Sequence, residues 1–383
     1  MSAPGSTASL RTANQRRVVE ALRASLESEL SQAEISRATE LAPATVSNIV
    51  KELSAAGFLE SESGAGRRGA TVKIARGAGL VAGVDFGHTH LQIALGDLSG
   101  DVLGTIARPL KNDHDHAEGL ALAAELLDSL LAGQGADRSE LRAVGMGLPA
   151  PISNSGTIDS GSILPGWVGV NAAAVAGAKF GVKTLVDNDA NLGALAEHAL
   201  GVGVGSTSMA YLKISSGVGC GLILEGKVFR GGLGTAGEIG HLTMDENGPL
   251  CRCGSRGCLE AYVGADALIA QFAGRQPDIT ATELIALALD GDTGAQRLIE
   301  DSGRYLGRAA AILANVLGLE LIVIGGDMIA AGDLLFDGVR NGIRRHALEP
   351  VAKTVRVEQA ALGDKSSAIG SLLFALEAVE LPS

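Results

Sequence analysis

Three of the four cysteines of this 383-residue chain lie within eight residues, and no other feature restricts the fold as strongly. Cys251, Cys253 and Cys258 follow His241, with nine residues between the histidine and the first cysteine. One imidazole and three thiolates form a closed tetrahedral Zn²⁺ site that leaves no position for a reactive water molecule. We therefore predict a structural zinc ion on these four residues. The alternative is three unpaired thiols beside a surface histidine, and Cys220 receives no role.

Carboxylates flank the predicted metal loop. Glu238 precedes the histidine and Glu260 follows the last cysteine, so a bound metal would direct both side chains towards one cleft. A second acidic group, Asp187-Asn188-Asp189, stands where a predicted strand runs into a helix. Asp189 could face a substrate hydroxyl there as a general base. Helix capping would explain the same residues without any chemistry.

Three glycine turns follow predicted strands and have the composition of phosphate-binding loops. In Asp85-Phe86-Gly87-His88-Thr89, backbone N–H groups and a hydroxyl can meet a phosphate while the aspartate holds Mg²⁺. An ordinary hairpin turn is the alternative for so short a pattern. The second turn contributes Ser216, Gly217 and Gly219, and the third is the pair Gly325 and Gly326.

From residue 80 onwards, short apolar strands alternate with helical patterns, which indicates an α/β fold. We predict strands at 81–85, 91–97, 144–148, 184–186, 209–214, 220–224 and 319–324. We predict helices at 117–131, 190–200, 265–272, 281–289 and 296–317. A linker near Gly77 separates this region from a different N-terminal module.

The N-terminal module has the pattern of a winged helix-turn-helix, which we place at residues 12–78 behind a flexible tail at 1–11. Helical spacing covers 12–26, and Ser31 with Glu34 forms a capping box that opens a helix at 32–38. Pro43 suits the first position of the next helix, and Gly57 ends it. Strands at 58–62 and 70–74 would form a two-stranded wing.

The second helix of such a motif lies in the major groove of DNA with its first residues at base edges. The residues in that position are Pro43, Ala44, Thr45, Ser47 and Asn48, with Lys51 nearer the phosphates. Arg67 and Arg68 at the wing tip suit a narrow minor groove. A winged helix that contacts protein instead is the alternative.

Composition supports two modules with different partners. The net charge of −12 combines ten basic and eight acidic residues in 1–78 with a strongly acidic remainder. Aromatic residues make up 3% of the chain, too few for a platform that stacks single-stranded bases. No uninterrupted apolar run reaches membrane-spanning length and no signal peptide is evident, so we expect a cytoplasmic protein.

The Glu238-x-x-His241 motif with Cys-x-Cys-x4-Cys, together with the glycine turns, resembles the ROK family of repressors, open reading frames and sugar kinases. The resemblance covers the whole chain and is strongest to the family's xylose- and N-acetylglucosamine-repressor-like branch. It implies a winged helix-turn-helix followed by a two-lobed actin/hexokinase-like fold at 79–383. Lobe 1 would hold about 79–192 with a C-terminal helix at about 367–381, and lobe 2 about 193–366.

The resemblance also implies residue roles. A sugar in the cleft would be contacted by Asn188, Asp189, Glu238, His241 and Glu260, with Asp189 the catalytic base in kinase members. The histidine would then place one ring nitrogen on zinc and the other on a sugar hydroxyl.

Several departures from the kinase pattern concern the phosphate turns. His88 stands where kinases carry glycine, Ser215-Ser216 replaces Gly-Thr, and Ile163 replaces a sugar-contacting asparagine. A side chain at a position of close backbone approach would crowd a nucleotide. We therefore expect a degraded phosphate set, doubtful Mg²⁺-ATP binding and residual or lost catalysis at Asp189.

The leading hypothesis is a sugar-responsive transcriptional regulator, most simply a repressor, whose DNA affinity falls when a monosaccharide, oligosaccharide or sugar phosphate binds. A homodimer or dimer of dimers would place two recognition helices on a palindromic operator. The rival is an ATP-dependent hexose or amino-sugar kinase with an appended DNA-binding domain. A third possibility is a regulator whose core binds a protein partner instead of a sugar.

Overall fold

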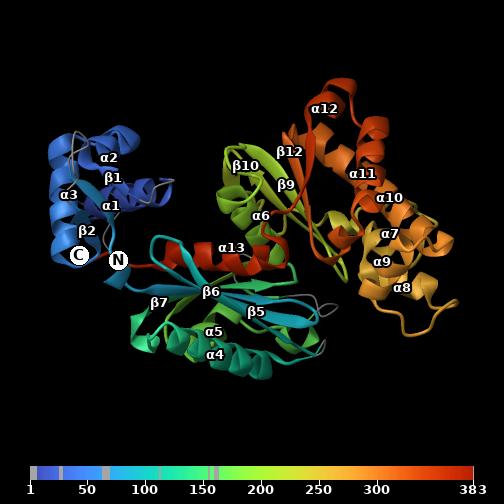
Figure 1. Cartoon of the computed structure of the whole chain (residues 1–383), viewed down its shortest axis with the longest axis horizontal. Coiled ribbons are helices and arrows are strands. Elements are labelled where there is room, and N and C mark those ends of the chain that lie inside the picture. Colours follow the sequence, from blue (N-terminus) through green and yellow to red (C-terminus); the bar gives the residue numbers. More distant parts are fainter. Residues whose placement is uncertain are drawn as a thin grey trace.

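A computed structural model of the chain describes residues 7–25, 29–62, 70–111, 114–153, 156–158 and 164–382. Figure 1 shows a small helical domain beside two α/β lobes, as the sequence pattern predicts. Among the described residues, no helix has the length and apolar character needed to cross a membrane.

The small domain is a winged helix. Its helices are α1 (Thr7–Arg23), α2 (Gln32–Thr39) and α3 (Pro43–Ala55). The predicted capping box is confirmed, because Ser31 Oγ accepts from the Glu34 N–H while the Glu34 carboxylate accepts from the Ser31 N–H. The predicted wing strands are β2 (Leu59–Glu62) and β3 (Thr71–Ile74), but the sheet has a third member, β1 (Glu29–Ser31), paired with β3. The wing tip with Arg67 and Arg68 lies outside the described residues.

Lobe 1 contains a five-stranded sheet in the order β6-β5-β4-β7-β8. The strands are β4 (Leu80–Phe86), β5 (His90–Asp97), β6 (Val102–Pro109), β7 (Leu141–Leu148) and β8 (Lys183–Asn188). Helices α4 (His116–Gly133) and α5 (Ala172–Phe180) cover one face, and α13 (Ser366–Ala375) covers the other (Figure 1). Strand β4 is buried along its whole length, so its carboxyl end delivers Asp85 to the interior.

Lobe 2 contains a second five-stranded sheet in the order β11-β10-β9-β12-β13. The strands are β9 (Ser208–Ile214), β10 (Val218–Leu224), β11 (Lys227–Val228), β12 (Leu321–Gly325) and β13 (Arg356–Gln359). The helices beyond it are α7 (Glu260–Val263), α8 (Ala265–Phe272), α9 (Ala281–Leu289), α10 (Thr293–Leu317), α11 (Asp333–His346) and α12 (Glu349–Thr354). The predicted hairpin of β9 and β10 is confirmed in register, with Lys213 opposite Gly219.

Helices α6 (Asp189–Leu200) and α13 pack against each other between the two sheets. Glycines permit this approach, because a Cβ at Gly370 would lie 1.8 Å from the Leu192 carbonyl oxygen. Likewise, a Cβ at Gly83 of β4 would lie 2.1 Å from the Ala368 carbonyl oxygen. The α6–α13 pair therefore joins the lobes at the floor of the cleft. The predicted domain and lobe limits stay predictions.

The winged helix is packed onto lobe 1 and the C-terminal segment. One buried apolar cluster joins Val18 and Leu22 of α1 to Leu98, Leu372 and Val379 of the core. Arg23 Nε donates to the Leu98 carbonyl at 2.9 Å, and burial lowers the Arg23 pKa to about 10. The winged helix is thus in direct contact with α13 and the segment that follows it (Figure 1).

Candidate functional site

A cleft between the lobes collects most of the sequence-predicted chemistry. Lobe 1 supplies the loop after β4. Lobe 2 supplies the loop after β9 and the segment 241–258, called the cysteine loop below. The lining includes the predicted sugar-contacting residues Asn188, Asp189, Glu238, His241 and Glu260, and the predicted phosphate-turn residues Gly87, Thr89, Ser216, Gly217 and Gly219. Gly325 and Gly326 are not among the lining residues, and Asp85 is fully buried beneath the cleft.

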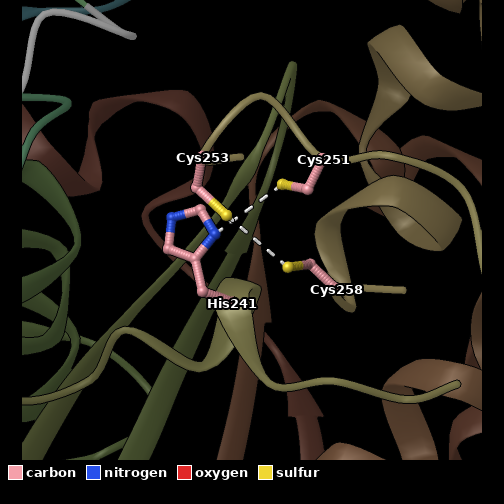
Figure 2. Close-up of side chains that lie close together, drawn as sticks. All are labelled: His241, Cys251, Cys253 and Cys258. Carbon is pink, nitrogen blue, oxygen red and sulfur yellow. Dashed lines mark hydrogen bonds between the residues drawn. The ribbon is translucent and has the colours of Figure 1, made fainter. Parts of the chain in front are cut away.

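The predicted metal-ligand set comes together at one side of this cleft. In Figure 2 the imidazole of His241 and the three cysteine sulfurs converge on one point. All four donor atoms lie within 4.8 Å of one another, with His241 Nδ1 3.8 Å from Cys251 Sγ and Cys253 Sγ 3.7 Å from Cys258 Sγ. Zn–S bonds of about 2.3 Å in a tetrahedron separate neighbouring sulfurs by about 3.8 Å. The group could therefore hold a metal ion.

Local backbone interactions fix the cysteine loop. Isolated bridges pair Thr243 with Cys258 and Leu250 with Arg256. Gly257 has a φ of +63°, and a Cβ there would lie 1.6 Å from the Asp245 carbonyl oxygen. Only glycine fits this position, so the backbone itself brings Cys258 back beside the histidine.

Glu238 faces the other ring nitrogen of the histidine. Its Oε2 lies 3.9 Å from His241 Nε2, on the cleft side of the ring. Burial, with added repulsion from Asp189 and Glu260, raises the Glu238 pKa to about 7. A carboxyl group with this pKa can both donate to and accept from a ligand hydroxyl near neutral pH.

The residues 187–189 at the start of α6 have different roles: one caps the helix and another faces the cleft. Asn188 is the N-cap, since its Oδ1 accepts from the Ala190 N–H at 2.9 Å and its Nδ2 donates to the Ala150 carbonyl. The capping alternative therefore describes Asn188, although it also lines the cleft. Asp187 accepts a 2.7 Å hydrogen bond from Arg230 Nε. Asp189 takes no part in capping and turns to the cleft.

Lys213, which the sequence analysis passed over, is the partner of Asp189. Its Nζ lies 2.7 Å from Asp189 Oδ2 and 3.3 Å from Ser367 Oγ. Burial opposes the charge of this ammonium, but attraction to Asp189 and Asp85 holds the Lys213 pKa above its ordinary value. The available signal was a lone lysine in the otherwise apolar stretch 209–214, next to a glycine turn.

Glu260 is also paired within the protein. Arg252 Nε and Nη2 each donate to one of its carboxylate oxygens at 2.8 Å, and the Val218 N–H donates at 3.1 Å. Arg252 stands between Cys251 and Cys253, so the loop that gathers the cysteines also delivers this guanidinium to the cleft.

The glycines of the phosphate turns are closely approached by protein atoms. A Cβ at Gly87 would lie 2.2 Å from the His90 ring, and one at Gly217 would lie 2.3 Å from the Arg252 guanidinium. A Cβ at Gly325 would lie 2.3 Å from the Tyr211 hydroxyl. A residue with a Cβ would therefore clash with neighbouring side chains at each of these three positions.

The candidate DNA-reading residues lie on the outer face of α3. Pro43, Ala44, Ser47, Asn48 and Lys51 are exposed, and Thr45 is partly buried. The opposite face of the helix packs Val46, Ile49, Val50 and Leu53 into the domain core. The helix therefore leaves Ser47, Asn48 and Lys51 exposed on the face opposite its core contacts.

Comparison with known proteins gives two family matches. The ROK family model matches residues 81–378, and the MarR family model matches residues 11–69. The chain is 29% identical to a putative xylose repressor of Caldicellulosiruptor sp. strain Rt8B.4, covering 89% of this chain and 90% of that protein. It is 30% identical to the DNA-binding transcriptional dual regulator NagC of Escherichia coli K12, covering 89% and 87% respectively.

Solved structures show both branches of the same fold. A ROK family transcriptional regulator homologous to E. coli MLC superposes with a TM-score of 0.82 at 25% identity, covering 96% of each chain. A ROK family glucokinase from Streptomyces griseus, solved with glucose and AMPPNP, superposes with a TM-score of 0.68 at 26% identity. That match covers 78% of this chain and all of the kinase.

Proposed function

We infer, from the premise that this chain belongs to the ROK family, that it is a sugar-responsive, DNA-binding transcriptional repressor. The observation that carries this conclusion is the near-complete match to regulators that combine a winged helix with a ROK core. The kinase match leaves the winged helix uncovered.

We propose that α3 enters the major groove and reads base edges through its exposed first turns. Ser47 and Asn48 can exchange hydrogen bonds with bases, while Lys51 meets phosphate. Arg67 and Arg68 would extend the contact into the adjacent minor groove. The acidic core contributes no attraction to DNA, so affinity would depend on these few placed groups.

We propose that the effector sugar binds where Asp189, Glu238 and His241 meet. These three polar side chains line the cleft together with the apolar Pro149 and Pro151, a combination that suits a ring with hydroxyl edges and C–H faces. His241 supports this assignment because Nδ1 faces the cysteines while Nε2 faces the cleft. Asn188 and Glu260 would add contacts after local rearrangement of their present partners.

We propose Zn²⁺ as the ion of the four-ligand group. One imidazole and three sulfurs match zinc, and four protein ligands leave it a structural role. The ion would hold the loop that carries Arg252, and so place Glu260 at the wall of the cleft.

A continuous path of contacts joins the cleft to the winged helix and supports coupling between sugar binding and DNA binding. Arg230 pairs with Asp187 beside the cleft, and its guanidinium lies 5.3 Å from the centroid of the Phe374 ring in α13. The same helix supplies Leu372 to the cluster that holds the winged helix. A sugar that changes lobe closure would therefore shift the surface against which the winged helix packs. Linkage then requires that bound DNA lower the affinity for the sugar by the same factor by which the sugar lowers the affinity for DNA.

We propose that the active form is a homodimer on a palindromic operator. An exposed apolar group at the end of lobe 2 supports self-association: Ile312 and Val316 of α10 lie near Leu348, whose N–H donates to Asn315 Oδ1. Analytical ultracentrifugation of the wild type and of Val316→Asp tests this, since the variant should sediment as a smaller species.

The test of the function has two parts. Thermal-shift screening against monosaccharides and their phosphates should find a ligand that raises the Tm, because a ligand stabilises the state it binds. Gel-shift titration with the upstream region of the protein's own operon should then show that this ligand weakens DNA binding. DNA affinity unaffected by every sugar that binds would refute the sensing mechanism. A coupled ADP-release assay on the same sugars tests the kinase alternative.

A further inference from the structure

The cleft contains a protein cation, Lys213, paired with Asp189, the carboxylate that would be the catalytic base in a ROK kinase. Lys213 extends from β9 of lobe 2, and its ammonium contacts Asp189 of α6 and Ser367 of α13. The buried Asp85 of β4 attracts it without a hydrogen bond. Its side chain is 14% exposed and that of Asp189 is 8% exposed, so the pair is shielded from solvent. The ammonium thus joins elements of both lobes at the hinge.

One oxygen of the Asp189 carboxylate is already paired with a protein cation. Mg²⁺ binds carboxylate oxygens at about 2.0–2.1 Å and holds its ligands in an octahedron. Asp189 Oδ2 already lies 2.7 Å from Lys213 Nζ. A metal on the same oxygen would stand next to the ammonium, and the repulsion between the two cations would displace one of them.

The Asp85 carboxylate is compensated by nearby charge without a direct contact to Lys213. Neither of its oxygens has a hydrogen-bond partner within the described part of the chain, yet the side chain is 1% exposed. His90 Nε2 lies 3.4 Å from Oδ2 and forms an ion pair when protonated. Burial opposes ionisation of Asp85, but attraction to Lys213 and contact with His90 hold its pKa below the ordinary value.

The charges of this group balance without any added ion when His90 is protonated. Asp85 and Asp189 supply two negative charges, Lys213 supplies one positive charge, and protonated His90 supplies the second. A buried charge is tolerated where it has an opposite charge beside it. A divalent cation would leave the same volume with an excess of positive charge, so the residues present do not fit a Mg²⁺-nucleotide.

We propose that Lys213 is a built-in counter-ion for Asp85 and Asp189 that takes the place of a divalent cation, and so makes this cleft a sugar site without Mg²⁺. It is a specificity-determining residue: it keeps Asp189 ionised and available as an acceptor for a sugar hydroxyl, while it denies a phosphoryl donor its metal. The inference concerns the cleft alone and does not rest on the proposed DNA binding.

The test measures binding of Mn²⁺, a probe for the Mg²⁺ position, to the zinc-loaded full chain by electron paramagnetic resonance. The wild type should bind no stoichiometric Mn²⁺ in the cleft. Lys213→Ala should gain one site per chain with at least tenfold higher affinity, because it leaves two carboxylates facing an empty volume. Lys213→Arg, which keeps the charge, should behave like the wild type. Asp85→Asn added to Lys213→Ala should abolish the gain.

Thermal unfolding tests the proposal even if the substitution lowers stability, because it compares the Tm of each variant with and without MgCl₂. Lys213→Ala should melt below the wild type, and its Tm should rise with MgCl₂ while the wild-type Tm does not. If the alanine variant does not fold, Lys213→Gln, which keeps a donor for Asp189, replaces it in both assays. A wild type that binds Mn²⁺ as tightly as the variants overturns the proposal, and so does a folded variant that gains no Mn²⁺ site. Sugar binding and DNA binding are not measured, so failure of the repressor function would not alter either outcome.

Discussion

Replacing Arg230 by methionine should uncouple sugar binding in the cleft from DNA binding by the winged helix without unfolding the protein. Methionine keeps an unbranched apolar stem against Phe374 but removes the guanidinium that pairs with Asp187. Asp187 would keep two other donors, the Asn191 amide at 2.9 Å and the Asn188 N–H at 2.7 Å. Oδ1 of Asp187 therefore stays hydrogen-bonded, although Oδ2 loses its cation, and we expect a folded but less stable protein.

The size of the effect follows from the two contacts that are lost. A hydrogen bond to a charged group contributes about 1.5–3 kcal/mol, and a cation–π contact at an exposed site about 0.5–1 kcal/mol. Because the Arg230 side chain is 37% exposed, solvent screening places the total near the lower limit. A sum of about 2 kcal/mol corresponds to roughly 30-fold in an equilibrium constant. If the two contacts form in only one arrangement of the lobes, this roughly 30-fold factor is the largest change in sugar–DNA coupling that their removal can cause.

Fluorescence anisotropy with a labelled operator measures this coupling as the ratio of Kd values with and without the effector sugar. In Arg230→Met the ratio should fall towards one, with the sugar-free Kd close to that of the wild type. Lys227→Met, on the exposed strand of the same hairpin, is the matched control and should keep the wild-type ratio. A wild-type ratio in Arg230→Met, with sugar binding intact, would refute the path through α13.

The remaining predictions address the metal, the DNA face and one ion pair. Cys253→Ser should bind well under one Zn²⁺ per chain by elemental analysis and lose sugar-induced stabilisation; a wild type without zinc would end that account. Asn48→Ala should weaken operator binding by about 1–3 kcal/mol with relaxed base preference, whereas Lys51→Ala should lower the salt slope by about one. Contact with Asp85 holds the His90 pKa above its ordinary value against the effect of burial. The stability that His90 contributes should therefore be present below about pH 6.5 and be lost as pH rises through the raised pKa. Urea unfolding of the wild type and His90→Asn from pH 5.5 to 8.5 should show their free energies of unfolding converge at high pH, and a constant difference would contradict the ion pair.

Sequence patterns predicted the elements whose residues are close together along the chain. The hairpin of β9 and β10, the capping box at Ser31 and the proline at the start of α3 all depend on neighbours within a few positions. Strand β1 was missed because three residues carry no periodicity, and its pairing with β3 spans some forty residues. Strand β6 was missed for a different reason: it lies at a sheet edge with mostly exposed side chains, so burial imposes no alternation on it.

The same limit applies to the site. The cluster of His241 and three cysteines could be predicted because its four donors are close together in the sequence, and the structure brings all four together. The partners of the acidic residues could not, because each comes from a distant element: Lys213 reaches Asp189 from lobe 2, and Arg230 reaches Asp187 across the hinge. A motif search identifies the carboxylates and assigns them kinase roles, whereas only the fold shows which cations neutralise them. Lys213 pairs with one oxygen of Asp189 and keeps the carboxylate ionised, so its position favours the use of Asp189 as an acceptor for a sugar hydroxyl.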